Sequence, residues 1–325
     1  KFIRGLSADM DDLLTKKGQK QAEDFLKYTL VCIAEDRFEP FPAPMPAPAH
    51  RPVSIPTAPT PKKEGTVAIV TDCQTDDVQL SRMIERFCAV SPYNTKVVNI
   101  ADYPFKGGCL GCFGCAVSGK CIYNDGFDTF LREQIQTCKA TVYAFSIKDH
   151  SMGARFKLFD DRQFCNGHRT VTMGSPVGYL ISGDYSREFN LQMILEGHSQ
   201  VGGNFFAGAA TDELDPDGDI DRMAFSLGYA LDKGYTPPSN FYGVGGMKIF
   251  RDLIWLMQGM MRADHKFYKS HGQYDFPQKK RGTMLKMYLV GALIASPKIK
   301  AKMGNKMNEG MLAPYKKVLD KPDKQ

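Results

Sequence analysis

The sequence lacks the features that mark several common classes of protein. The longest apolar candidate, Met287–Pro297, is much shorter than the ~20 residues that a membrane-spanning helix needs. No G-x-G-x-x-G follows a predicted strand, so NAD(P)H binding has no motif of its own. A nucleophile elbow and a His/Glu zinc signature are also missing. No catalytic residue is therefore assigned from motifs.

Proline is concentrated in one stretch. Nine of the 22 residues from 40 to 61 are proline, which favours an extended chain and excludes a helix or a central strand. We predict a Pro-rich linker over 37–64 and a domain boundary near residue 62. Before it, apolar residues recur at helical spacing, and the chain starts at Lys1 rather than Met. We expect residues 1–36 to be the helical end of a preceding domain.

After the linker, short apolar β-branched runs alternate with amphipathic helical patterns. Strand and crossover helix in alternation predict a parallel sheet with helices on both faces. Five such units are typical of a doubly wound, flavodoxin-like α/β domain, which we place at 65–240. Binding sites in these folds lie at the carboxyl ends of the strands. The expected strands are 66–71, 95–100, 140–147, 177–182 and 204–209, and the expected helices are 78–90, 127–137, 187–197 and 220–233.

Beyond Gly234 the pattern becomes helical and rich in methionine. We predict helices over Lys248–Met261 and Thr283–Ala295, within a basic helical extension of residues 241–325. The net charge of the chain is +6, yet residues 279–325 alone hold twelve Lys and Arg against three Asp and Glu. The basicity therefore belongs to the tail.

The basic, Met-rich extension indicates an interaction surface. Flexible Met-rich faces suit adaptable binding, and clustered lysines attract an acidic partner over about 8 Å. We expect a redox partner protein or the subunits of a larger complex, with a homo-oligomer as a further option. The alternative is that the helices of this extension complete the core. Binding to a membrane surface ranks lowest. No nucleic-acid partner is expected.

Cysteine is the residue type that carries the clearest chemical signal. Four of the nine cysteines lie within 13 residues, as Cys109-x2-Cys112-x2-Cys115-x5-Cys121, among glycines that allow tight turns. Four thiolates hold an iron–sulfur cubane, and close spacing lets one loop surround it. A disulfide scaffold would be shorter, with its cysteines spread out, so a reduced, cytoplasmic compartment fits better. The spacing predicts a [4Fe–4S] cluster.

Two alternatives to the cluster remain open. Structural zinc sites usually use two separated Cys pairs, whereas three cysteines at consecutive x2 spacing suit a cubane better. Four free thiols in a glycine-rich loop are the other alternative. The remaining cysteines are expected to be ordinary buried small hydrophobic residues: Cys32, Cys73, Cys88, Cys138 and Cys165.

With this motif, the segment from about Gly65 to Ala210 resembles the iron–sulfur flavoprotein branch of the NADPH-dependent FMN reductase family. The resemblance is carried by PFKGGCLGCFGCAVSGKC, NDGFDTFL and SMGARFKLFDDR. In that family, the segment after the third strand shields the flavin and enters a helix whose Lys and Asp-Arg pair match Lys157, Asp161 and Arg162. The resemblance implies a flavodoxin-like fold, an FMN near the cluster and electron transfer between them. It also suggests the C-terminal part of a tandem-domain member.

The sequence departs from that family's pattern at two places. Where the family has a Gly/Ser/Asn/Thr-rich phosphate loop, this chain has DCQTDD at 72–77, whose carboxylates oppose a phosphate. Asp76 and Asp77 are also explained as caps of the following helix. After the third strand, SIKDH replaces the family's Pro-x-Tyr. The residues expected around an FMN are Thr71, Gln74, Thr75, Ser81, Ile147, Lys148, His150, Ser151, Met152, Gly183 and Asp184.

These observations lead to two functional hypotheses. The first is an NAD(P)H-dependent, oxidoreductase-like iron–sulfur flavoprotein, whose FMN and cluster lie at the same sheet edge. The second is a non-catalytic electron wire or structural subunit of a larger redox complex, with a degenerate flavin site. The acidic loop favours the second hypothesis, and the overall match favours the first. The acidic stretch 212–221 lacks calcium-loop spacing and is expected to be a solvated loop.

Overall fold

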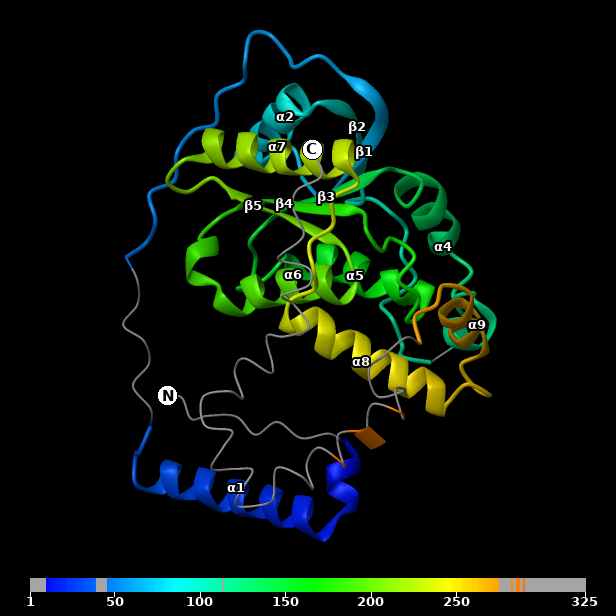
Figure 1. Cartoon of the computed structure of the whole chain (residues 1–325). Helices are drawn as coiled ribbons and strands as arrows, with labels where there is room; N and C mark the ends of the chain where they lie inside the picture. Colours follow the sequence, from blue (N-terminus) through cyan, green and yellow to red (C-terminus); the bar gives the residue numbers. More distant parts are fainter. Residues whose placement is uncertain are drawn as a thin grey trace, which may run out of the picture. The chain divides into compact units, whose positions relative to one another are not determined.

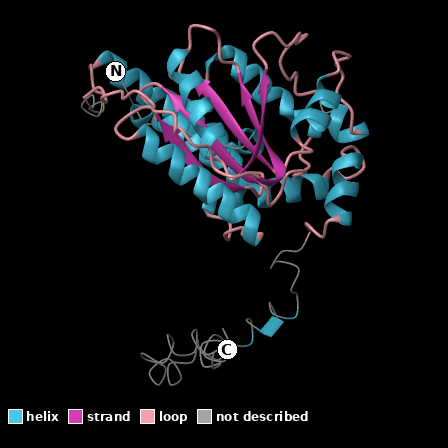
Figure 2. Ribbon diagram, turned by 90° about the horizontal axis from the view of Figure 1, so that it is seen from above, coloured by secondary structure: helices cyan, strands magenta, loops and turns pink. Residues whose placement is uncertain are grey.

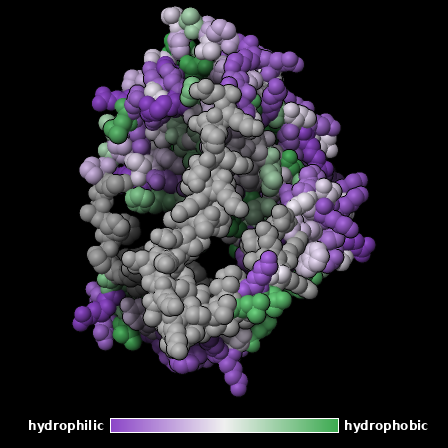
Figure 3. All heavy atoms as spheres, in the orientation of Figure 1, coloured by the Kyte–Doolittle hydropathy of each residue, from purple (hydrophilic) through white to green (hydrophobic). Residues whose placement is uncertain are grey.

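The computed structural model describes residues 10–38, 46–112 and 114–274, together with residues 282, 285, 286 and 289. The chain divides into a first unit, Lys1–Phe250, and a second unit, Arg251–Gln325. Each is described by itself. On the face shown in Figure 3, the described surface is mainly hydrophilic, with scattered hydrophobic residues.

The first unit is built on a five-stranded parallel sheet. Its strand order is β2-β1-β3-β4-β5, and every neighbouring pair is parallel. This order is that of the flavodoxin-like fold, with its topological switch point between β1 and β3. The predicted fold class is therefore confirmed. The strands are β1 (Lys63–Thr71), β2 (Tyr93–Asn99), β3 (Ala140–Ser146), β4 (Pro176–Ser182) and β5 (Phe205–Thr211).

Helices cover both faces of this sheet (Figures 1 and 2). One face packs on α2 (Val78–Val90) and α7 (Pro216–Lys233) around an aliphatic core. The other face packs on α4, α5 and α6 around a core rich in phenylalanine. The elements of this second layer are α4 (Phe127–Phe130), η2 (Leu131–Ile135), α5 (Gly153–Arg162), η3 (Gln163–Asn166), η4 (Tyr185–Arg187) and α6 (Phe189–Val201).

The central strands β1, β3 and β4 form where the sequence predicts them because they are buried on both faces. The last five residues of β1 are all buried, as are the first six of β4. Strands covered on both sides read as continuous apolar runs, which need no alternation. The helix predicted over 78–90 has the predicted bounds. The helix predicted over 127–137 is shorter and ends in the π-type turn η2.

The terminal segments are only partly described. η1 (Met10–Leu14) precedes α1 (Lys16–Ala34), in which the Thr15 hydroxyl accepts from Gly18 N at 3.0 Å as an N-cap. After the sheet come α8 (Phe241–Leu256) and α9 (Arg262–Ser270). The basic tail and most of the predicted helix 283–295 lie outside the described residues. Among the residues that are described, no helix is long and apolar enough to span a membrane.

The second half of the predicted linker is packed against the first unit. We call residues 46–62 the strap. Val53 is only 2% exposed and belongs to the aliphatic core. Thr60 N donates to Ala89 O at 2.9 Å, and Lys62 Nζ donates to Ser91 O at 2.6 Å. The prolines keep the strap extended, as expected, but it is docked along its length. The domain boundary near residue 62 stays a prediction.

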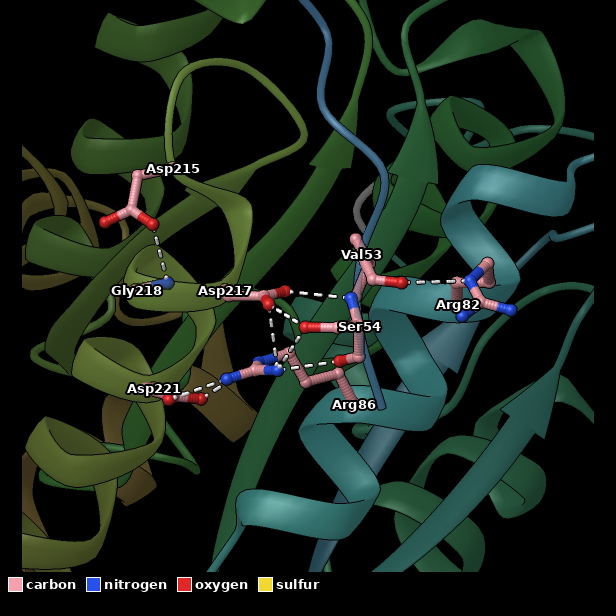
Figure 4. Close-up of polar contacts among 8 residues, drawn as sticks. All are labelled: Val53, Ser54, Arg82, Arg86, Asp215, Asp217, Gly218 and Asp221. Carbon is pink, nitrogen blue, oxygen red and sulfur yellow. Dashed lines mark hydrogen bonds and ion pairs between the residues drawn. The ribbon is translucent and has the colours of Figure 1, made fainter. Parts of the chain in front are cut away.

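Arg86 on α2 is the main anchor of the strap (Figure 4). Its guanidinium donates to Ser54 O at 2.7 Å and pairs with Asp221 at 2.8 Å and Asp217 at 3.2 Å. Asp217 also accepts from Ser54 N at 3.1 Å. Nearby, Arg82 Nε donates to Val53 O at 3.0 Å. The stretch 212–221 is therefore not simply a solvated acidic loop, because its carboxylates hold the strap.

We expect Arg86→Met to loosen the strap. The substitution removes the charge-assisted bonds, and it should lower the free energy of unfolding by about 1–2 kcal/mol, since both carboxylates are partly exposed. Limited proteolysis within 46–62 should accelerate as well. The matched control is Arg222→Met on α7, whose exposed ion pairs should contribute almost nothing. Equal effects of the two substitutions would contradict this assignment.

Candidate functional site

We call the segment between the end of β2 and the start of α4 the cysteine loop. It begins at the carboxyl end of β2 and follows α5 along its length. Arg155 near the start of α5 donates from Nε to Ile100 O at 3.1 Å and also donates to Tyr103 O. Arg162, two turns later on the same face, donates to Gly107 O at 2.9 Å. The two arginines therefore carry the loop from the carboxyl edge of the sheet to the C-terminal end of α5.

Arg162 also forms a buried ion pair with Asp125. The two N···O distances are 2.7 and 2.8 Å, and the side chains are 1% and 3% exposed. Asp125 accepts in addition from Lys106 N at 3.2 Å and from Phe127 N at 3.3 Å. The hydrogen bonds from Arg162 hold the pKa of Asp125 well below its usual range. Both ends of the cysteine loop, and the start of α4, are thus tied to α5.

The four predicted ligands line one cavity of about 160 Å³ (Cys109, Cys112, Cys115 and Cys121). The first two are exposed and the last two are half-buried. Gly111 and Gly119 have φ values of 61° and 78°, which L side chains rarely adopt. The glycines therefore make the turns that bring the cysteines to the same cavity.

Arg162 lines this cavity too, and it leaves one donor unsatisfied. Its Nε is buried and has no hydrogen-bond partner among the described residues. A buried donor without a partner costs about 1–3 kcal/mol. An electron-rich guest beside Arg162 would remove that cost. The donor set and the unpaired Nε both fit an anionic cluster bound by thiolates.

A single metal ion fits this arrangement less well. Within 10–38, 46–112 and 114–274, no three His, Cys, Asp or Glu side chains converge closely enough to hold one ion. Around one tetrahedral zinc, with Zn–S bonds of about 2.3 Å, the sulfur atoms would lie about 3.8 Å apart. The thiolates of a cubane bind different irons, so they are more widely spaced. Among the described residues the structure therefore shows no metal site, and both the cluster and the zinc alternative stay predictions.

The cavity wall also includes residues that the sequence did not indicate, among them Cys165 and His168. Cys165 is 3% exposed, and burial raises its pKa to about 12. It is buried, as expected of an ordinary hydrophobic cysteine, but it lies beside the predicted ligands. Arg169 supports the same region by donating to Cys115 O at 3.0 Å. Spacing gave no signal for these residues, because they come from η3 and the loop that follows it.

At the carboxyl edge, one of the residues predicted to hold a phosphate, Gln74, is already paired with a carboxylate. Asp77 Oδ2 accepts from Gln74 N at 2.9 Å, and Oδ1 accepts from Ser146 Oγ at 3.2 Å. Asp77 therefore links the β1 and β3 loops at the switch point, where the fold would place a flavin phosphate. It is the N-cap residue of α2 but makes no side-chain cap bond, so the capping interpretation is wrong for Asp77.

The charges of this loop also oppose a second anion. Burial, followed by the charges of Asp77 and Asp72, raises the pKa of the Cys73 thiol to about 11. Asp72 is itself buried at 6% exposure, and burial raises its pKa. The Asp77 carboxylate therefore weakens the predicted phosphate site, and FMN binding there stays a prediction.

The other predicted flavin residues lie at the same edge but in different settings. Met152 is buried in the core, whereas the His150 ring is exposed and its Nδ1 lies 2.8 Å from Glu188. Asp149 and His150 both have positive φ, which marks a tight turn. None of the predicted residues lines the cysteine cavity. Thr71 is buried; Gln74, Thr75 and Lys148 are exposed; Ser81, Ile147, Ser151, Gly183 and Asp184 are half-buried.

The strap reaches this edge through His50. Its Nε2 lies 2.8 Å from Asp184, and its Nδ1 lies 3.0 Å from Asp212. Asp212 also accepts from Ser182 Oγ at 2.7 Å and from Gly183 N at 3.0 Å. The hydrogen bond to Asp184 is the main cause that raises the pKa of His50. A residue expected to line the flavin pocket is therefore bound by the strap.

The cysteine cavity and the predicted flavin pocket lie at opposite ends of α5. The pocket residues surround the start of α5 at Met152, and the cavity is formed at its end by Arg162 and η3. Ten residues of helix separate two points by about 15 Å. The predicted cluster site and the predicted flavin site therefore do not share one sheet edge, contrary to expectation.

Comparison with known proteins adds likeness of fold only. No family model and no curated protein matches the chain. Among solved structures, RosB with a bound 8-demethyl-8-formylriboflavin-5'-phosphate matches at 10% identity, over 57% of this chain and 85% of RosB, with a TM-score of 0.41. An oxidoreductase from Corynebacterium diphtheriae matches at 14% identity, over 52% of this chain and 97% of its own, with a TM-score of 0.36. Such scores carry no argument about function.

A third match is an FMN-dependent NADH-azoreductase from Bacillus anthracis, in complex with FMN. It shares 10% identity over 52% of this chain and 98% of its own, with a TM-score of 0.35. The bound flavin ligands belong to the matched proteins. The fold of this chain is established by its own strand order.

Asp125→Asn should destabilise the protein strongly. It leaves the Arg162 charge buried without a counter-charge, which lowers the free energy of unfolding by about 3 kcal/mol or more. Denaturant titration measures this change. The control is Asp161→Asn on α5, whose exposed partner is Lys157; it should cost less than about 1 kcal/mol. A similarly small loss for Asp125→Asn would show that the pair does not anchor the loop.

The docking of the strap should weaken as the pH rises. His50 has a raised pKa in the folded protein, so protonated His50 stabilises the fold fully below its ordinary pKa of about 6.5. That stabilisation is lost as the pH rises through the folded pKa. Free energies of unfolding measured from pH 5 to 9 should therefore converge for the wild type and His50→Gln at high pH. A constant difference across the range would rule out this linkage.

Proposed function

We propose that the protein is an electron-transfer protein whose [4Fe–4S] cluster is held by Cys109, Cys112, Cys115 and Cys121. The observation that carries the proposal is the single cavity lined by all four cysteines and by Arg162, whose buried Nε has no partner among the described residues. A bound cluster would supply one-electron transfer at a potential set by charge and hydrogen bonding around its sulfurs. The Asp77 carboxylate at the switch point favours this function over flavin catalysis.

The surrounding residues have separate roles in this proposal. The Arg162–Asp125 pair fixes the loop on α5, and the guanidinium places a positive charge beside Cys121. A cation next to thiolate sulfur stabilises the reduced, more negative form of a cluster and so raises its reduction potential. Arg162 is thus a positioning residue that also tunes the potential.

The exposed side of the cysteine loop is where a redox partner protein would approach. Cys109 and Cys112 are exposed, and Leu110 and Ile122 beside the cysteines are 66% and 59% exposed. Exposed apolar side chains around a redox site suit a short-lived docking contact. This supports the expected redox partner, whether a separate protein or a subunit of a larger complex.

The cluster prediction is tested by metal content. Anaerobically purified protein should contain about four irons and four sulfides per chain, with broad visible absorption. Cys112→Ser should lose most of both. Cys138→Ser is the control, because this half-buried cysteine lies outside the cavity wall. Stoichiometric zinc without iron would refute the proposal, and so would equal iron loss in both variants.

A flavin-dependent oxidoreductase is the second candidate, because the strand order places a switch point between β1 and β3. In this candidate FMN would bind at the carboxyl edge, and an NAD(P)H-dependent reaction would follow the family that the sequence resembles. The Asp77 carboxylate stands against it. For that reason we assign no catalytic step to the carboxyl edge.

Two single substitutions separate these candidates. A carboxylate about 5 Å from a phosphate charge opposes it by roughly 3 kcal/mol at an effective dielectric near 20. Asp77→Ser should therefore tighten FMN binding at least tenfold, measured by quenching of flavin fluorescence. Asp76→Ser is the control, since the exposed Asp76 has no role in the switch-point contacts. Tight FMN binding by the wild type, unchanged in Asp77→Ser, would restore the flavin candidate.

A further inference from the structure

A second and larger cavity, of about 610 Å³, adjoins the cysteine cavity in the first unit. It lies on the face of the sheet that α5 and α6 cover, between these helices, the loop after η3 and the first part of α8. Ligand pockets of small molecules usually measure about 300–1,000 Å³ and combine apolar walls with a few polar groups. Its apolar and aromatic walls include Tyr143, Phe164, Val177, Tyr179, Ile194 and Phe250.

The packing of α8 on α6 creates this space. A Cβ atom on Gly246 would lie 2.4 Å from Val201, and one on Gly243 would lie 2.9 Å from Gln200 O, so the two helices approach closely there. Farther along α8, the Phe250 ring contacts the His168 ring at 4.9 Å between centroids. Inside the cavity, nothing lies within 4 Å of a Cβ built on Gly197. The space is thus bounded at both ends of this part of α8, but its rim is open to solvent, since Phe164 is 49% exposed and the His198 side chain is 51% exposed.

A chain of polar side chains crosses the wall of the cavity. Tyr143 Oη donates to Gln163 Oε1 at 2.9 Å, Gln163 Nε2 donates to Asp160 Oδ1 at 3.5 Å, and His198 Nδ1 lies 3.5 Å from the same oxygen. Each of these four residues lines the cavity. Because Nδ1 faces Asp160, Nε2 of His198 is the ring nitrogen left for a guest.

The pairing with Asp160 favours the protonated form of the His198 ring, and in that form both ring nitrogens are hydrogen-bond donors. The hydrogen bond to Asp160 is the main cause that raises the pKa of His198. Burial alone would raise the pKa of Asp160, but His198 and then Lys157 outweigh it, and the pKa is lowered. Groups whose pKa values are moved apart within a cavity are typical of functional sites. A guest with an oxygen acceptor would pair with Nε2.

We propose that this cavity binds a planar aromatic compound that carries a carbonyl oxygen. The rings would pack against the aromatic walls, and the oxygen would accept from His198 Nε2. Phe164, Gly167 and His168 line both this cavity and the cysteine cavity. A compound bound here would lie next to the cluster and could exchange electrons with it. This role rests on the proposed function. The binding itself does not depend on it.

Two probes of the same shape test the proposal on the full chain. 9-Oxofluorene-2-carboxylate is a planar aromatic ketone, and fluorene-2-carboxylate lacks the carbonyl oxygen. We expect saturable one-to-one binding of the ketone by calorimetry, about tenfold tighter than that of fluorene-2-carboxylate, because a hydrogen bond to a charged donor is at stake. No saturable binding of either probe would overturn the proposal.

Two glycine substitutions test where the probe binds. Gly197→Leu fills the cavity from α6 and should weaken ketone binding at least tenfold. Gly245→Leu on α8 is the matched control, since it also faces open space but lies outside the cavity wall. Both helices should tolerate leucine, which has a higher helix propensity than glycine. Equal affinities in the two variants would show that the probe binds elsewhere.

The last two variants separate the roles of His198 and the cysteines. His198→Phe keeps a ring in the wall and should abolish the preference for the ketone, with little change in the affinity for fluorene-2-carboxylate. Cys112→Ser should bind the ketone as the wild type does, even if it holds no iron. If Cys112→Ser still binds the ketone, the proposal for this cavity holds even when the cluster proposal is refuted. A ketone preference unchanged in His198→Phe would contradict the assigned donor.

Discussion

Arg162 is a buried cation at the end of α5, and the position of the cysteine loop depends on its pairing with Asp125. Both side chains are almost fully buried, so either charge alone would be strongly unfavourable. The pair therefore forms only when the loop returns to α4 at the correct place. In that arrangement the four cysteines line one cavity, and the Nε left over is available for an electron-rich guest.

The carboxyl edge of the sheet is organised in the opposite way, because its own side chains satisfy its polar groups. Asp77 links the β1 and β3 loops, and His50 of the strap lies between Asp184 and Asp212. A flavodoxin-like sheet usually offers its site at this edge. Here the cavities lie along the helical layer below the sheet, at the far end of α5. The fold is retained, and we propose that the chemistry of this chain takes place at these cavities.

The sheet could be predicted because its central strands are short apolar runs buried on both faces, and α2 could be predicted because its amphipathic period is regular. That the four cysteines line one cavity could be predicted because they share one loop, whereas their role as cluster ligands stays a prediction. The roles of His50, Asp77 and Cys165 could not be, since they depend on partners far away in the sequence. His50 meets Asp184 across 134 positions. The local sequence pattern predicts that Asp77 caps α2, but in the structure its side chain bonds Ser146 of β3 instead.

The most direct test of the central claim is Mössbauer spectroscopy of ⁵⁷Fe-labelled protein, purified without oxygen. A cubane on the four cysteines predicts one spectrum of delocalised, tetrahedrally sulfur-coordinated iron that accounts for nearly all the iron, and one-electron reduction should change it as a unit. Isolated ferrous or ferric sites, or protein that contains only zinc, would contradict the claim that this loop carries a [4Fe–4S] cluster.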